Sequence, residues 1–426
     1  MVEVLTAAIR GSDAYAAVRR AVKLEEGVLR VGNRFVQRSK VREVAFLAVG
    51  NCAAAMARGF HDALGEVVTQ GLVGGPEPPP EPWPFLFRKV SDPLLPTTEG
   101  AALAAEAIEM AEGLSGTDLF VPLLSPGAQG MLSTPPPGLD LPTYRTLLEK
   151  VLEGSRRSDE DLPAVVRALS PAQGGGLARA ARATSTEALW VVREVQEAAN
   201  RPLGAGPTFP ASPEAAERAR SVLGSLGLYA NLPSSVRDRL APGGAPGGAV
   251  GPDLHNVIVV SPSDALETAG AEAAFRKHRP HLVKLHDPSG PEEAADHLLA
   301  ALEERAPHRP SESKEGIALF SGVTLGAPEG GEERELIFRF LARAGSRLQR
   351  REATVAILYT GGSLSPSTTP SGGMVDARGT LTLAKFVPRT RGVLDLTPGF
   401  TDVGSIAVAY LGGPGEGPSP EPRRRR

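Results

Sequence analysis

The chain has 426 residues, a formal net charge of −3 and a hydrophobic content of 41%, values typical of a globular protein with more than one domain. The small net charge gives no basis for predicting nucleic-acid or membrane-surface binding, and no apolar run approaches the roughly 20 residues that span a bilayer. The single cysteine, Cys52, excludes an intramolecular disulfide framework. The N-terminus lacks the basic and then apolar segments of a signal peptide, so we expect a cytoplasmic protein.

The first half of the chain alternates apolar strand patterns with helical ones. In chain order we predict a helix over 5–22, a strand over 41–49, a helix over 52–64, a strand over 85–90, a helix over 99–113 and a strand over 119–124. Further helices are expected over 144–154, 159–169 and 177–183, then a strand over 188–195 and a helix capped by Ser212. Abundant loop proline and the excess of arginine over lysine resemble the composition of thermophile proteins.

A Gly/Pro-rich segment over 241–253 has no periodicity and predicts a linker. It separates a module at 1–240 from one at 254–414, and a tail at 415–426 that ends in four arginines, Arg423–Arg426, is expected to be disordered. Beyond the linker we predict strands over 257–260, 281–285, 317–320, 354–359 and 406–411, with helices over 263–275, 292–305 and 332–350. This alternation indicates an α/β fold with parallel sheets covered by helices in two successive modules.

Ligands of parallel α/β sheets bind beyond the carboxyl ends of the strands. This rule selects four loops as candidate sites: Gly50–Asn51, 125–130, 193–200 and 360–371. The second follows the buried strand over 119–124, where small residues are typical of anion binding by backbone N–H groups. Pro126, however, has no N–H to offer after Ser125. A serine-hydrolase nucleophile at Ser125 is disfavoured for the same reason, and because Leu123 stands where that motif needs glycine.

Other site chemistries are also disfavoured by the sequence. No phosphate-binding P-loop and no dinucleotide-binding glycine motif is present between a strand and a helix. His281 and His286 would lie on opposite faces of the predicted strand, so we expect no shared metal ion. Cys52 is expected to be a small core residue. The loop at 360–373 is rich in hydroxyl groups but has no carboxylate, so it is a poor site for a hard divalent cation.

Several motifs along nearly the whole chain resemble the glycerate 2-kinase family, two-domain kinases also labelled hydroxypyruvate reductases. The similar segments are Val49–Ala57, Leu123–Leu132 with Pro136–Leu139, Leu169–Ala178, Ala205–Thr208 and Gly330–Glu335. The resemblance implies a large Rossmann-like domain of parallel strands with helices on both faces, and a smaller C-terminal α/β domain. It also implies an active site between the two domains.

The departures from the family pattern fall on residues that would carry the chemistry. Asn51 and Gln173 stand where the family has lysines, and Pro126-Gly127-Ala128 replaces a Gly-Gly-Gly phosphate loop. The remaining substituted positions are Glu194 and Ala198, Ser321–Val323, Glu332 and Glu333, Gly362, Ser365 and Thr369, and Thr401–Ser405, which includes Asp402. Phosphoryl transfer depends on positioning and on cationic stabilisation of phosphate oxygens, so these losses predict a degenerate kinase site.

Three functional hypotheses follow. The first is a catalytically degenerate relative of glycerate 2-kinase with a structural or regulatory role, paired with an active paralogue or with a second copy, and with no cofactor or metal. The second is a divergent kinase that transfers phosphate from Mg-ATP to D-glycerate or a related hydroxy acid. Its remnants would be Ser125, Gly127, Gly174, Gly175, Glu194 and Glu335. The third is a binding module for a small neutral or cationic ligand.

Overall fold

The computed structural model describes residues 2–154, 160–181, 185–193, 206–210, 212–241, 250–251, 253–283, 290–305, 316–323, 333–348, 353–359, 371–376, 381–385 and 405–411. These residues form two compact units. The large unit holds the described residues between Asp13 and Ser261, and the small unit combines the first helix with the described residues from Pro262 onward. These divisions differ from the predicted boundaries at 1–240 and 254–414, because residues 254–260 pair with the sheet of the large unit. Most of the predicted linker at 241–253, and the tail at 415–426, lie outside the described residues.

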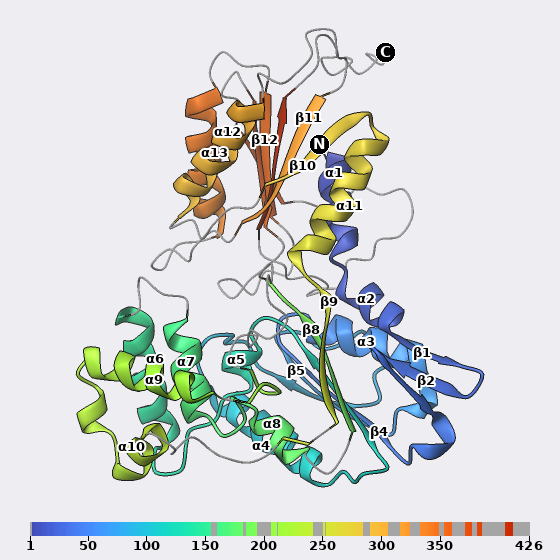
Figure 1. The fold of residues 1–426 in the computed structure, drawn as a ribbon, viewed down its shortest axis with the longest axis vertical. Coiled ribbons are helices and arrows are strands. Elements are labelled where there is room, and N and C mark those ends of the chain that lie inside the picture. Colours follow the sequence, from blue (N-terminus) through green and yellow to red (C-terminus); the bar gives the residue numbers. More distant parts are fainter. Residues whose placement is uncertain are drawn as a thin grey trace. The chain divides into compact units, whose positions relative to one another are not determined.

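The large unit is built on a six-stranded sheet with the order β6-β5-β4-β7-β8-β9 (Figure 1). Every neighbouring pair in it is parallel. The strands are β4 (Val44–Val49), β5 (Gln70–Gly75), β6 (Leu86–Lys89), β7 (Leu119–Leu124), β8 (Ser185–Val191) and β9 (Leu254–Val260). Central strands β4 and β7 are buried along their whole length, as expected for a parallel sheet with both faces covered. The predicted strand over 119–124 is confirmed at both ends.

Two helices cover opposite faces of this sheet, as the alternation of side chains along a strand requires. Helix α3 (Ala53–Leu64) contributes Phe60, whose ring packs against Phe46 of β4. Helix α4 (Thr98–Glu112) begins where the Thr97 hydroxyl accepts a hydrogen bond from Gly100 N–H. Its buried side chains join one core cluster with alternate residues of β4, including Leu47. The parallel α/β layer predicted from the sequence is therefore present.

A group of helices beside the sheet forms a second core in the same unit (Figure 1). Its helices are α6 (Leu141–Gly154), α7 (Asp161–Leu169), α9 (Pro213–Ser225) and α10 (Ser234–Leu240). Two short helices, α5 (Ala128–Met131) and α8 (Gly176–Ala180), follow the glycine-containing loops. Fully buried Tyr144 of α6 lies in this core.

The N-terminal segment differs from its prediction. Residues 5–22 form two helices, α1 (Val2–Gly11) and α2 (Ala14–Ala21), because the Asp13 side chain caps α2 by accepting a hydrogen bond from Ala16 N–H at 3.1 Å. Helix α1 belongs to the small unit and α2 to the large one. A three-stranded antiparallel sheet follows α2, made of β1 (Val22–Glu25), β2 (Val28–Val31) and β3 (Arg34–Gln37).

The small unit has a six-stranded sheet with the order β10-β11-β15-β12-β13-β14. Its strands are β10 (His278–Leu282), β11 (Gly316–Val323), β12 (Ala353–Tyr359), β13 (Ser371–Asp376), β14 (Leu381–Lys385) and β15 (Ser405–Leu411). Only β10 and β11 are parallel, and the other neighbours are antiparallel. The expectation of a parallel sheet in this module was therefore wrong, since β15 inserts between β11 and β12 and β13 pairs directly with β12.

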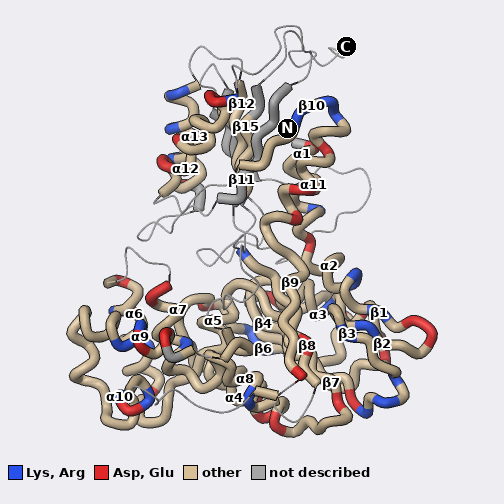
Figure 2. The backbone as a smooth tube through the Cα atoms, viewed as in Figure 1, with Lys and Arg blue, Asp and Glu red and all other residues tan. Residues whose placement is uncertain are grey.

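Helices α1 and α11 (Pro262–Phe275) pack together in the small unit, and α12 (Pro291–Arg305) and α13 (Glu333–Leu348) form a second pair. Basic and acidic segments lie side by side on α12 and α13 (Figure 2). Arg339 forms a two-point ion pair with Glu292, and Arg343 forms one with Asp296. Beneath these pairs, Leu298, Phe340 and other apolar side chains form the core.

Candidate functional site

The carboxyl ends of β4 and β7 bring two of the predicted site loops together. Val49 and Leu124, the last residues of these strands, are register partners. Beyond them, the Asn51 N–H donates to the carbonyl oxygen of Pro126 at 2.8 Å. Gly50 has a φ of 119°, and a Cβ there would collide with Ser125, so this close approach of the two loops requires glycine.

Ser125 is buried and both of its hydroxyl contacts are internal. Its Oγ accepts a hydrogen bond from Cys52 N–H at 3.0 Å and donates to the carbonyl oxygen of Val49 at 3.3 Å. Its backbone N–H donates to the same carbonyl at 3.0 Å. Ser125 therefore fastens the turn after β4 to the end of β7. Cys52 is fully buried, as predicted for a core residue.

Most backbone donors of the loop at 125–130 already have protein acceptors. The Ala128 N–H donates to Ser125 O at 3.1 Å, and the Gly130 N–H donates to Pro93 O at 3.1 Å. Ser125 N–H is bonded to Val49, and Pro126 has no N–H. At most the N–H groups of Gly127 and Gln129 are left for an anion, so this loop is a poor phosphate cradle.

Gln173 lies against the same loop and is fully buried. Its side-chain Nε2 donates to three carbonyl oxygens, those of Ala128 at 3.2 Å, Gln129 at 3.3 Å and Leu132 at 3.0 Å. These carbonyls belong to α5 and its C-terminal end, and that of Ala128 also accepts a hydrogen bond from Leu132 N–H at 3.0 Å. The Gln173 Oε1 atom is buried without a hydrogen-bond partner in the described structure. Gln173 therefore acts as a C-terminal cap of α5 and is committed to the protein interior.

The glycines after Gln173 pack against a third family-like segment. Gly174 and Gly175 have φ values of 55° and 76°, in the left-handed region that favours glycine. The Gly175 N–H donates to Gly206 O at 2.8 Å, and a Cβ on Gly175 would lie 2.7 Å from the Cα of Pro210. The described contacts of this turn are therefore packing contacts.

Those of the remaining predicted site residues that the structure describes belong to the small unit. Glu335 is an exposed residue of α13, in the small unit. Glu333 begins the same helix, and Ser321–Val323 lie in β11. Outside the described residues lie Glu194, Ala198, Glu332, Gly362, Ser365, Thr369 and Asp402.

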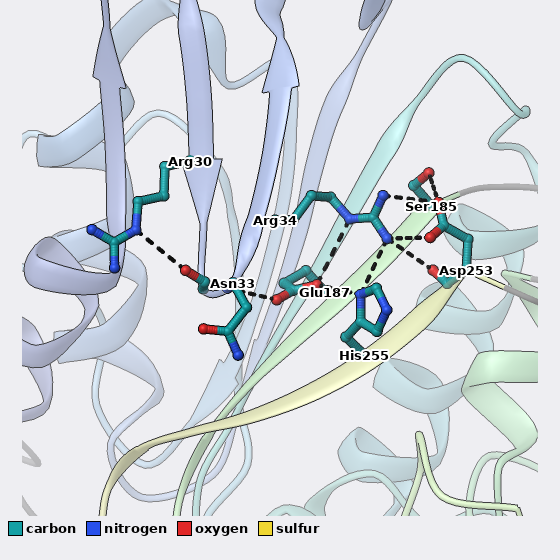
Figure 3. Close-up of polar contacts among 8 residues, drawn as sticks. Arg30, Asn33, Arg34, Ser185, Glu187, Asp253 and His255 are labelled. Carbon is teal, nitrogen blue, oxygen red and sulfur yellow. Dashed lines mark hydrogen bonds and ion pairs between the residues drawn. The ribbon is translucent and has the colours of Figure 1, made fainter.

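A second polar cluster lies at the amino-terminal ends of β8 and β9, whereas the loops described above follow the carboxyl ends of β4 and β7 (Figure 3). The Glu187 carboxylate is fully buried and accepts a hydrogen bond from Asn33 N–H at 3.0 Å. It also lies 3.0 Å from His255 Nδ1 and 3.7 Å from Arg34 Nε. Arg34 forms a two-point ion pair with Asp253, so the cluster joins the turn after β2 to the large sheet. The sequence signal for this cluster was a glutamate directly before the apolar run 188–191.

Within the described ranges, no three or more His, Cys, Asp or Glu side chains are grouped so that they could hold a metal ion. No helix in the same ranges combines the length and apolar character needed to cross a bilayer.

Residues 1–241 match the family described as "Domain of unknown function (DUF4147)". The chain belongs to this family. Curated relatives include glycerate kinases, for example that of Bos taurus, 29% identical over 275 residues, which are 60% of this chain and 51% of the relative. The glycerate kinase of Mus musculus is 32% identical over 183 residues, 42% of this chain and 34% of the relative. The chain thus spans about half or less of these relatives' length. Its predicted membership of the glycerate 2-kinase family is confirmed.

Two solved structures share the fold of the whole chain. The PH0495 protein from Pyrococcus horikoshii has a TM-score of 0.73 and 20% identity, with 96% of this chain and 97% of that chain covered. The glycerate kinase from Thermotoga maritima has a TM-score of 0.71 and 18% identity, with 96% and 98% covered. The expected two-domain α/β fold of the glycerate 2-kinase family is therefore confirmed.

Proposed function

We propose that this member of the glycerate 2-kinase family has a degenerate active site and is inactive as a kinase. The contacts of Gln173 carry this proposal. It stands at a family lysine position, and its buried amide spends both N–H donors on three carbonyl oxygens of α5. A neutral side chain committed in this way cannot stabilise the charge that develops on a transferring phosphoryl group.

The loop at 125–130 supports the same conclusion. Its donors at Ser125, Ala128 and Gly130 are bonded within the protein, and Pro126 has none. Removal of one preorganised donor from a catalytic anion site typically costs about 10²–10³ in rate. The family has lysine where this chain has Asn51. Together with that difference, these changes leave the loops without the groups that bind nucleotide phosphates.

The proposed role is structural or regulatory, in the cytoplasm, with an active paralogue or a second copy of the chain as partner. An exposed sheet edge supports a partner of similar fold. Strand β10 is an edge strand of the small unit, and it has exposed Leu282 at its end and exposed Phe275 just before it. Light scattering on the purified chain, with Leu282→Lys as the comparison, tests self-association. A chain that is monomeric at all concentrations leaves only the paralogue as partner.

A divergent kinase is the second candidate, favoured by the curated names of the relatives and by the left-handed glycines that persist at Gly127, Gly174 and Gly175. Calorimetric titration with Mg-ATP separates the two candidates. If the site is degenerate, the titration should give no saturable heat up to millimolar nucleotide. Saturable binding that disappears in Asn51→Trp, a variant that fills the space beside Gly127, would support the kinase.

A further inference from the structure

The segment from Arg19 to Arg42 is strongly basic, although the chain as a whole is not. It contains eight arginine or lysine residues and two acidic ones, so its formal charge is +6, against −3 for the whole chain. The segment covers the end of α2, the three-stranded sheet β1–β3 and the turn that follows it. Figure 2 shows the Lys and Arg residues along these elements. The small net charge of the chain therefore conceals a local concentration of positive charge.

The β1–β3 sheet has one buried and one exposed face. Val22 and Val31, which are register partners, are buried on one side. Side chains alternate along a strand, so the neighbouring residues in sequence point to the other side. There the register aligns Lys23 with Arg30, and Arg30 with Phe35. One residue from each strand thus contributes to a single row across the exposed face.

This row combines two cations with an exposed aromatic ring. Phe35 is 68% exposed, and the guanidinium carbon of Arg30 lies 5.7 Å from the centre of its ring, within the range of a cation–π contact. Lys23 forms an ion pair with Glu25 at 3.3 Å. Both of these side chains are exposed, and ion pairs between exposed side chains contribute little free energy. Lys23 can therefore exchange this partner for another anion at little cost.

We propose that the row Lys23–Arg30–Phe35 binds single-stranded nucleic acid. A base can stack on the Phe35 ring or on the guanidinium plane of Arg30, because both lie on the open face of a sheet. The ammonium group of Lys23 and the guanidinium group of Arg30 can contact backbone phosphates, and the other cations of the segment add a positive field around them. No residue of the strand-end loops takes part, so this binding is independent of the kinase question.

Two other anionic partners fit this face less well. An acidic peptide matches its charge but has no planar group to stack on the exposed ring of Phe35. An anionic membrane surface also matches the charge, but interfacial binding depends on a larger buried apolar area than one phenylalanine side chain provides. Single-stranded nucleic acid uses both the charge and the ring.

Fluorescence anisotropy of a labelled oligothymidylate, titrated with the full chain at several NaCl concentrations, tests the contribution of the ring. Wild type should bind saturably, and more weakly as salt rises. Phe35→Ala should weaken binding about tenfold at every salt concentration, because a stacking contact is lost. The dependence of log K on log salt concentration should keep its slope, since no charge is removed. Phe338→Ala, which removes an exposed ring from α13, is the control and should bind like wild type.

A charge variant gives the complementary result. Lys23→Gln should reduce the magnitude of the salt slope by about 0.7, the value expected for the loss of one phosphate contact to a single strand. Lys150→Gln is the matched control, because it removes the same charge from an exposed position on α6. The side chains at all four substituted positions are exposed, so the variants should remain folded.

A glutamate-rich peptide serves as the competing ligand in the same titration. It should displace the oligothymidylate only poorly, because it cannot stack on Phe35. Absence of saturable oligothymidylate binding to wild type, or equal affinity of wild type and Phe35→Ala, would overturn the proposal. Displacement by the peptide at a concentration equal to that of unlabelled oligothymidylate would also overturn it and would identify the face as a surface for acidic proteins. None of these results bears on glycerate phosphorylation, which is measured separately.

Discussion

The side-chain amide of Gln173 donates a hydrogen bond to the carbonyl oxygen of Leu132 at 3.0 Å, across the turn that ends helix α5. This contact holds the C-terminal end of α5 against the segment that carries Gln173. The amide supplies a donor to the carbonyl oxygens of Gln129 and Leu132, and a second donor to that of Ala128, which also accepts from Leu132 N–H at 3.0 Å. The loop that includes α5 is therefore fixed from the protein interior by an uncharged side chain.

Substitution of Gln173 by Leu should destabilise the large unit. The variant removes both side-chain donors and leaves the buried carbonyls of Ala128 and Leu132 with fewer partners, which we expect to cost about 1–3 kcal/mol of unfolding free energy. Urea unfolding measures this loss. Gln129→Leu is the control, since its partly exposed side chain should change stability by no more than about 0.5 kcal/mol. Equal stability of Gln173→Leu and wild type would contradict the capping role.

The buried pair of Glu187 and Arg34 predicts strong non-additivity. Arg34→Leu leaves the fully buried Glu187 carboxylate without its nearest guanidinium group, and we expect a loss of about 3 kcal/mol. The double variant Arg34→Leu/Glu187→Leu should recover much of this loss, because no unpaired charge remains buried. A double-mutant cycle by urea unfolding measures the coupling. Additive losses would show that the two side chains stabilise the protein independently.

Asp118 predicts a loss of stability in acid. Burial raises the pKa of its carboxyl group, but hydrogen bonds from Arg42 and Ser115 outweigh this effect and hold the pKa below the ordinary value. The stabilisation is therefore complete above the unfolded-state pKa of about 4 and is lost as pH falls through the folded-state pKa. The stability difference between wild type and Asp118→Asn should be largest at neutral pH and shrink below about pH 4. A difference that does not change with pH would contradict this role of the ionised carboxylate.

The ion pairs between α12 and α13 should be sensitive to salt. Arg343 and Asp296 are partly exposed and joined by two hydrogen bonds of 2.8 Å. Arg343→Gln should lower the melting temperature at low ionic strength, and the difference from wild type should narrow in 1 M NaCl, where the Debye length is about 3 Å. If the difference is the same at both salt concentrations, the arginine stabilises the helix pair through packing of its aliphatic stem instead.

The sequence predicted well those elements whose pattern is decided locally. The strand Leu119–Leu124 is apolar throughout and stops at a proline-glycine loop, so its ends are visible in the sequence. The break at Asp13 was missed because the apolar stripe continues across it, although aspartate is a strong N-cap. Strand β5 was missed because three glycines among its six residues weaken the strand pattern. Its position depends on pairing with β4 and β6.

The sequence predicted which loops form the candidate site, but not the contacts that their side chains make. Motif positions identified the loops at 50–51, 125–130 and 173–175, and the first two meet at the ends of paired strands. Sequence alone could not show that Gln173 would bury its amide against α5, because that depends on three carbonyl groups 41 to 45 residues earlier in the chain.

The most direct test of the account is transfer of phosphate from Mg-ATP to D-glycerate by the purified full chain. The reaction should be followed to an end point by the appearance of phosphorylated glycerate, with the Thermotoga maritima glycerate kinase assayed in parallel. Any residual product should be compared with that of Asn51→Trp, which reports whether the chain's own strand-end loops produce it. We predict no product above the level of this variant. Turnover comparable to that of the parallel enzyme, abolished by Asn51→Trp, would contradict the degenerate site.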